Sequence, residues 1–189
     1  MRILGIAGSV RRGSHNRRLL RAAGDMLPPG VDFVEWDGLG GLPIFDEDLE
    51  TTPPPAVQDF LTAVEEADGL LIATPEYNAS VPGGLKNALD WASRPFPDNV
   101  LRDKPSAVIG ASTGLFGAVW AQAETRKVLG AMGGRVVEAE LPVPRAQEQY
   151  EDGRLTLFPE QSQQLEEILA ELLSEVEQRS GYDREGAAA

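Results

Sequence analysis

Continuous apolar runs alternate with amphipathic stretches along most of the chain, and this alternation predicts strands followed by helices. The apolar run at 69–74 is typical of a strand in a parallel sheet covered on both faces. Leucines and isoleucines that recur every three or four positions at 165–176 indicate a helix with one buried face. The predicted strands are residues 2–7, 31–36, 69–74, 104–112 and 135–137, with a small extra strand at 155–158. The predicted helices are residues 16–27, 56–67, 85–93, 118–132 and 160–178.

This order of elements predicts an α/β fold with a parallel sheet, right-handed connections and helices on both faces. A length of 189 residues and a hydrophobic content of 42% suit one domain with a substantial core. We expect that domain to span residues 1–179 and a flexible tail to span 180–189. Two segments fall outside the repeat. Residues 37–52 form a long loop, which usually serves function or subunit contact, and 141–152 read as an irregular polar segment.

The first strand leads through a loop at 8–15 into a helix that opens near Asn16. The N–H groups of such a turn and the positive end of the helix dipole point at one place, which favours an anion. Ser9 and Ser14 add hydroxyl donors, and Arg11 lies inside the loop, where we expect it to contact the anion. For the three arginines on the helix, two interpretations stay open, an anion contact and a solvated basic face. These residues are Arg17, Arg18 and Arg21.

Two common phosphate-binding motifs are absent from this loop. Gly8 and Gly13 have the separation of a Walker A loop, but Ser14 and His15 follow them, and no lysine lies nearby. The three glycines of the dinucleotide fingerprint are also missing. What remains is a hydroxyl- and arginine-rich loop suited to a phosphate monoester.

Three loops rich in small residues follow the first, third and fourth strands, at 8–15, 75–84 and 113–117. Ligands of open parallel sheets bind beyond the carboxyl ends of the strands. The three loops are therefore expected to meet at one edge of the sheet and to form one site.

Composition narrows the choice of partners. The net charge of −13 argues against general binding to nucleic acid or to anionic membranes. The absence of cysteine excludes disulfides, thiolate metal sites and a cysteine nucleophile, and a single histidine argues against a histidine metal site or a serine–histidine–aspartate triad. No apolar run reaches membrane-spanning length, and Met1 leads directly into the first strand without a signal peptide. We expect a cytoplasmic protein without a bound metal.

The three loops together resemble those of the NADPH-dependent FMN reductase family, which includes the soluble quinone and chromate reductases. Segments 8–16, 75–78 and 111–114 with Gly117 carry the resemblance, and the stretch 82–91 that follows the second loop adds to it. The resemblance implies a flavodoxin-like three-layer α/β/α sandwich with a five-stranded parallel sheet of order 2-1-3-4-5. Many family members have a proline and a second glycine in the third loop, where this chain has Thr113 and Gly117-Ala118.

The resemblance also implies which residues contact FMN. The phosphate is expected on the first loop, at Ser9, Arg11, Ser14 and Asn16. The second loop is expected along the isoalloxazine ring, at Pro75, Glu76, Tyr77 and Asn78. The third loop is expected on the far side of the ring and the ribityl chain, at Ser112, Thr113 and Gly114. No catalytic residue is assigned, because the flavin ring itself accepts hydride.

The implied activity is that of an FMN-dependent NAD(P)H oxidoreductase, with NADPH (or NADH) as the donor. Hydride passes to bound FMN and then to a small-molecule acceptor, such as a quinone, a flavin, an azo dye or a metal oxyanion, with ping-pong kinetics. The family usually forms homodimers or homotetramers, and our candidates for the subunit contact are the loop around 45–48 and the helix that carries Lys86, Asp90 and Trp91.

Two other functions stay open on the sequence. A non-enzymatic electron carrier of the flavodoxin type would also hold FMN, but its first loop usually lacks arginines, whereas this chain has Arg11 and Arg12. A regulatory domain that binds a phosphate or nucleotide would use the same loop without redox chemistry.

Overall fold

The computed structural model describes residues 1–186 and contains one main parallel sheet. The sheet order is β2-β1-β3-β4-β5, which confirms the predicted order 2-1-3-4-5. A sixth short strand, β6, pairs in parallel with β4 beyond the end of β5. The strand bounds are β1 (Arg2–Ala7), β2 (Asp32–Trp36), β3 (Gly69–Thr74), β4 (Pro105–Ala111), β5 (Arg135–Val136) and β6 (Pro142–Val143).

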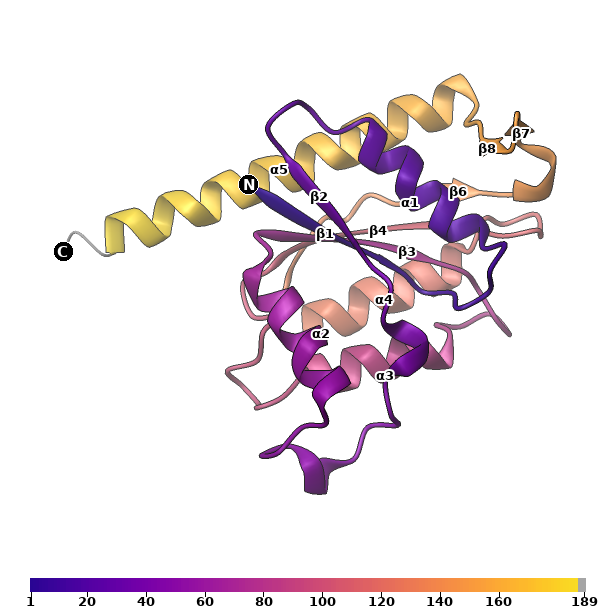
Figure 1. Cartoon of the computed structure of the whole chain (residues 1–189). Coiled ribbons are helices and arrows are strands. Elements are labelled where there is room, and N and C mark those ends of the chain that lie inside the picture. Colours follow the sequence, from indigo (N-terminus) through magenta and orange to yellow (C-terminus); the bar gives the residue numbers. More distant parts are fainter. Residues whose placement is uncertain (187–189) are drawn as a thin grey trace.

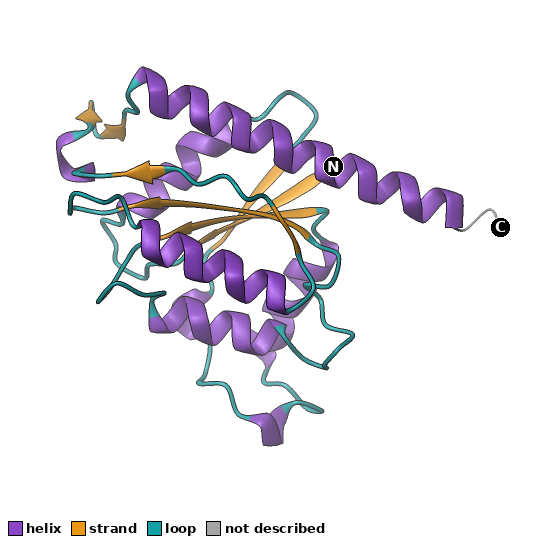
Figure 2. Cartoon of the chain, turned by 180° about the vertical axis from the view of Figure 1, so that it is seen from behind, coloured by secondary structure: helices purple, strands orange, loops and turns teal. Residues whose placement is uncertain are grey.

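Helices cover both faces of this sheet and give three layers (Figures 1 and 2). One face carries α1 (His15–Asp25) and α5 (Pro159–Gly186). The other face carries α2 (Pro55–Glu66), α3 (Gly83–Ala92) and α4 (Val119–Ala131). The predicted α/β sandwich is therefore confirmed.

Each central strand sends alternate side chains into two separate cores. Ile3 and Leu71 pack with α1 and α5, whereas their neighbours Leu4 and Leu70 pack with α2, α3 and α4. All four side chains are buried. Alternation between two covered faces explains why the strands read as continuous apolar runs.

The segment at 141–152 is more ordered than its sequence predicts. It contains β6, a 3₁₀ turn (Ala146–Glu148) and β7 (Tyr150–Glu151), which pairs antiparallel with β8 (Arg154–Leu155). Asp152 and Gly153 join β7 to β8 with φ of 47° and 76°, the backbone that a tight hairpin turn requires. The hairpin shifts the expected extra strand at 155–158 toward the N-terminus.

The long loop at 37–52 is attached to α3 of the same chain. Trp91 Nε1 and Asn87 Nδ2 donate to the Pro43 carbonyl at 2.9 and 2.8 Å, and the Phe45 N–H donates to Asn87 Oδ1 at 2.7 Å. The Phe45 ring meets the Trp91 ring edge-on at 5.0 Å. Trp91 is thus buried inside its own chain, so its side chain is a packing residue and cannot itself form a subunit contact.

Helix α5 continues through Ser180 to Gly186, where the sequence predicts a tail, and it extends past the sheet in Figure 1. The flexibility of this segment stays a prediction, and residues 187–189 lie outside the described part. Within residues 1–186, no helix has both the length and the apolar character needed to cross a membrane.

Candidate active site

The loops after β1, β3 and β4 meet at one edge of the sheet and enclose a cavity of about 300 Å³. The cavity contains all the residues expected to contact FMN except Asn78 and Gly114. The first loop contributes Ser9, Arg11, Ser14 and Asn16; the second contributes Pro75, Glu76 and Tyr77; the third contributes Ser112 and Thr113. The predicted convergence of three distant segments is therefore present in the structure.

The first loop forms the polar end of this cavity. Ser14 is the N-cap of α1, and its Oγ accepts the Arg17 N–H at 3.2 Å. The Ser14 N–H donates to the Arg11 carbonyl at 3.0 Å, and the Arg11 N–H lies 3.4 Å from Ser9 Oγ. The N–H groups in the first turn of α1 have no partner inside the helix, so a phosphate at this end would meet donors and the positive end of the dipole.

The structure distinguishes the roles of the arginines near α1. Arg17 pairs with Glu35 at 2.9 Å and also with Asp37, and Arg21 pairs with Glu35 at 2.8 Å. These two arginines attach α1 to the end of β2. Neither of them lines the cavity, and both are ion-paired rather than simply solvated. Arg11, in contrast, lines the cavity and forms no ion pair within the described residues.

Asn16 joins the start of α1 to the end of β4. Its Nδ2 donates to the Ala111 carbonyl at 2.8 Å, and its Oδ1 accepts the Ala111 N–H at 2.8 Å. Both the NH₂ group and the oxygen of this buried amide are hydrogen-bonded. Asn16 thus lines the cavity, but only its backbone N–H is free to meet an anion, and its side chain holds the first and third loops together.

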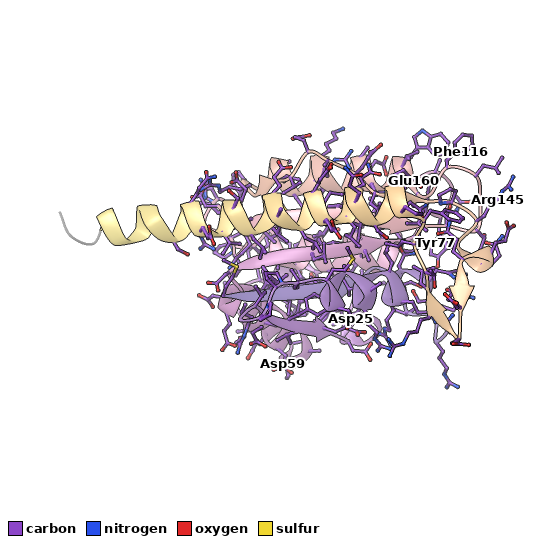
Figure 3. All side chains as sticks on the ribbon, turned by 90° about the horizontal axis from the view of Figure 1, so that it is seen from above. Asp25, Asp59, Tyr77, Phe116, Arg145 and Glu160 are labelled. Carbon is purple, nitrogen blue, oxygen red and sulfur yellow. The ribbon has the colours of Figure 1, made fainter. Side chains whose placement is uncertain are left out.

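The second loop turns tightly at its tip. Asn78 and Ala79 have φ of 55° and 57°, and Tyr77 and Ser80 exchange backbone hydrogen bonds of 3.2 and 3.1 Å on either side of them. This turn carries Asn78 away from the cavity and leaves the Tyr77 side chain 53% exposed at its mouth. In Figure 3, Tyr77 lies at the end of the molecule opposite the C-terminus, near Phe116 and Arg145.

Two glutamates fasten the second loop to α4. Glu76 Oε2 accepts the N–H groups of Trp120 and Ala121 at 3.0 and 3.1 Å. From α4, Glu124 Oε2 accepts the Ser80 hydroxyl at 2.7 Å and the Val81 N–H at 3.1 Å. The Glu76 carboxylate therefore caps the N-terminus of α4, where a negative charge is favourable. Glu76 also lines the cavity, and the contact of this loop with the isoalloxazine ring stays a prediction. The hydrogen bonds from Ser80 and Val81 lower the pKa of Glu124 from its ordinary value.

The third loop is held by the segment after β6. The Ser112 carbonyl accepts the Ala146 N–H at 3.0 Å, and the Gly114 carbonyl accepts the Arg145 N–H at 2.9 Å. The loop then closes through Gly117, whose φ is 59°. Ser112 and Thr113 consequently line the cavity, whereas Gly114 lies outside its lining.

His15 is a lining residue that the sequence analysis did not assign to the cavity. It is the first residue of α1, and its Nδ1 contacts the Tyr150 hydroxyl of β7. Burial and the guanidinium groups of Arg11 and Arg18 lower the pKa of His15 below its ordinary value. His15 lies between Ser14 and Asn16, both of which were expected to contact the phosphate, and this position is the sequence signal that could have predicted it in the cavity.

The donors and the topology fit FMN. Hydroxyls, an unpaired guanidinium and a helix N-terminus gather at one end of the cavity, which suits a phosphate monoester. The exposed side chain of Tyr77 stands at the mouth. A sheet of this order with such a site defines the class of flavodoxin-like proteins that bind a flavin mononucleotide.

Comparison with known proteins identifies the group within this class. Residues 1–148 match the model of the NADPH-dependent FMN reductase family, and the chain belongs to that family. An NAD(P)H-dependent FMN reductase of Pseudomonas aeruginosa is 46% identical over 130 residues, which are 68% of this chain and 69% of the relative. A 2-hydroxy-1,4-benzoquinone reductase of a Burkholderia species is 45% identical over the same shares of both chains.

The solved structures agree with this assignment. The flavoenzyme NAD(P)H:(acceptor) oxidoreductase FerB of Paracoccus denitrificans superposes with a TM-score of 0.80 and 31% identity, over 94% of this chain and 97% of that one. Family membership confirms the predictions of an oxidoreductase and of FMN and NAD(P)H as its cofactors. It also argues against the non-enzymatic carrier and the regulatory domain.

Proposed function

We propose that this chain is an FMN-dependent NAD(P)H oxidoreductase that passes hydride from NADPH to bound FMN and then to a small-molecule acceptor. The observation that carries this proposal is the cavity formed by the three loops, which is lined by the phosphate donors of the first loop and by the exposed Tyr77 of the second. FMN, when bound, supplies the hydride chemistry. The protein supplies position, charge and access.

Within this cavity, each part of the chain has a separate task. Ser9, Ser14 and Arg11 bind the phosphate, while the buried amide of Asn16 keeps the first and third loops in register. Glu76, bonded to α4, holds Tyr77 at the mouth. No residue needs to move a proton during hydride transfer to the flavin, in agreement with a chain that has a single histidine.

A quinone is the acceptor that the comparisons favour. One relative is named a 2-hydroxy-1,4-benzoquinone reductase, and others from Pseudomonas putida and Escherichia coli are named quinone reductases. Tyr77 of the cavity lining is exposed to solvent, and the donor and the acceptor would approach the flavin beside it in turn. Such shared access gives ping-pong kinetics, and flavins, azo dyes and metal oxyanions could follow the same route.

Absorption spectroscopy tests the proposal directly. The purified protein is saturated with FMN, freed of excess cofactor, and mixed with NADPH and then NADH without oxygen. A bound flavin band that bleaches, and returns when benzoquinone is added, supports the reductase. A bound band that neither donor bleaches supports an electron carrier. Protein that retains no flavin contradicts the assignment of the cavity.

Replacing Arg11 by alanine is expected to raise the FMN dissociation constant about 10- to 100-fold, because a hydrogen bond to a charged group contributes about 1.5–3 kcal/mol. Fluorescence quenching of FMN on titration with protein measures this constant. Arg12→Ala is the matched control, since Arg12 is adjacent but does not line the cavity. Equal affinities for the wild type and Arg11→Ala would remove Arg11 from the phosphate site.

We further propose a homodimer or homotetramer with α3 and the loop docked on it at the subunit interface. Ile44 and Phe96 beside them are 86% and 68% exposed in the single chain, which suits a covered surface. Light scattering at micromolar concentration is expected to give a dimer or a tetramer, and Ile44→Glu is expected to shift it toward the monomer. A monomeric wild type would contradict this interface.

A further inference from the structure

His15 lies where the phosphate end of the cavity meets an element outside the three loops. Its imidazole lines the cavity beside Ser14 and Arg11, and Nδ1 contacts the hydroxyl of Tyr150. Tyr150 belongs to the β7–β8 hairpin, which begins after residue 148, where the match to the family model ends. This contact between His15 and Tyr150 is therefore formed with a part of the chain that the family match does not cover.

The groups around His15 are mostly cationic. Arg11 comes from the first loop, and Arg18 comes from α1, where its guanidinium lies 4.8 Å from the centre of the Tyr150 ring. Across the cavity, the second loop presents Glu76, whose carboxylate is occupied by two N–H groups of α4, and Tyr77. In this setting, burial and then Arg11 and Arg18 lower the pKa of His15, and the imidazole is neutral at pH 7.

A bound phosphate would oppose these effects and raise the pKa of His15. A phosphate monoester carries a charge of about −1.5 to −2 at neutral pH, and it would lie among the lining groups that include His15. A nearby opposite charge shifts a pKa toward the charged form by about 1 to 3 pH units. The imidazolium form has two N–H donors, so that one can reach the phosphate while Nδ1–H donates to the Tyr150 hydroxyl.

We propose that His15 is a phosphate-binding residue that takes up one proton from solvent when FMN binds. This inference rests on the binding of FMN in the cavity. The β7–β8 hairpin orients the imidazole through Tyr150, and Arg18 holds the Tyr150 ring from its face. Binding of FMN is thus linked to pH. The affinity is highest when His15 is protonated, and it falls as the pH rises through the pKa of His15 in the complex.

The sole histidine of the chain makes this proposal directly measurable. In tag-free protein labelled with ¹³C-histidine, the Cε1 signal of His15 is followed by NMR from pH 5 to 9, with and without saturating FMN. We expect the pKa of His15 to be about 1 to 3 pH units higher in the complex. FMN that binds and leaves this pKa unchanged would overturn the role of His15 and leave the proposed reductase intact. FMN that does not bind at all would contradict the proposed function itself.

Two variants distinguish a role of the His15 charge from a role of its packing. His15→Gln keeps a polar side chain but cannot become charged, and it should weaken FMN binding about 10-fold or more at pH 6.5 but much less at pH 8.5. Tyr150→Phe keeps the ring beside Arg18 and removes the hydroxyl, so it should lower the pKa of His15 in the complex. An equal loss of affinity for His15→Gln at both pH values would show a packing role and overturn the proton linkage. The FMN phosphate itself also titrates, with a second pKa of about 6. Because this titration is common to the wild type and the variants, it cancels when their dissociation constants are compared at one pH.

Discussion

Replacing Gly117 by alanine is expected to lower the free energy of unfolding by about 3–5 kcal/mol, among the larger effects of a single substitution. Gly117 has a φ of 59°, where a side chain costs about 1–2 kcal/mol. A Cβ built on it would lie 2.5 Å from the Val143 nitrogen and 2.6 Å from the Pro142 carbonyl carbon. Both atoms belong to the backbone of β6, so that no side chain can move aside. Urea denaturation followed by circular dichroism measures the loss.

Gly114→Ala is the matched control for this substitution. Gly114 lies in the same loop, its φ is not positive, and the nearest atom to an added Cβ is Ser112 Oγ at 3.7 Å. We expect a change within about 1 kcal/mol, as for most exposed sites. Because Gly117 closes the third loop over β6, its alanine variant should also bind FMN more weakly. Equal stability of the two variants would contradict this account of the loop.

Replacing Asn16 by alanine is expected to cost about 2–4 kcal/mol of unfolding free energy and to weaken FMN binding as well. The substitution leaves the N–H and the carbonyl of Ala111 without partners in a buried position, and each unsatisfied group costs about 1–3 kcal/mol. It also releases the start of α1 from the end of β4, so that the donors of the first loop lose their position relative to the third. Thermal unfolding and FMN titration measure the two effects.

Asn87→Ala provides the comparison for Asn16→Ala. Asn87 also bonds to backbone groups in both directions, at Pro43 and Phe45, but it does so at the edge of a surface loop. Water can replace these bonds, and we expect a loss of about 1 kcal/mol with unchanged FMN affinity. A larger effect for Asn87→Ala than for Asn16→Ala would contradict the role of Asn16 as the link between the loops.

The sequence contained enough information for the fold and for the segments of the site. Strands such as 69–74 are apolar on both faces, and this pattern is typical of a parallel sheet that helices cover on both sides. Once the sheet is parallel, the carboxyl ends of its strands share one edge. The topology alone therefore predicts that the three loops meet at one site, and the family resemblance predicts which of their residues contact FMN.

The roles of individual side chains could not be read in the same way. Glu76 and Asn16 stand in the predicted loops, but their partners, the N-terminus of α4 and the backbone of Ala111, are distant in sequence. The β7–β8 hairpin was missed because its strands have only two residues each and carry no apolar alternation. The pair Asp152-Gly153 is the one local signal for this hairpin in the sequence.

Local sequence patterns thus predict the parts of the phosphate site: an apolar strand, a loop of hydroxyls and arginines, and the start of a helix. These patterns depend only on residues that are neighbours in the chain, so the sequence by itself is enough to recognise them. Only the tertiary structure decided that Arg17 and Arg21 pair with Glu35 while Arg11 remains in the cavity. It also decided that the lone histidine contacts Tyr150 of β7, outside the three loops. Hydrogen bonds and ion pairs depend on distances of a few ångströms between segments far apart in the chain, and these distances exist only after the sheet has formed.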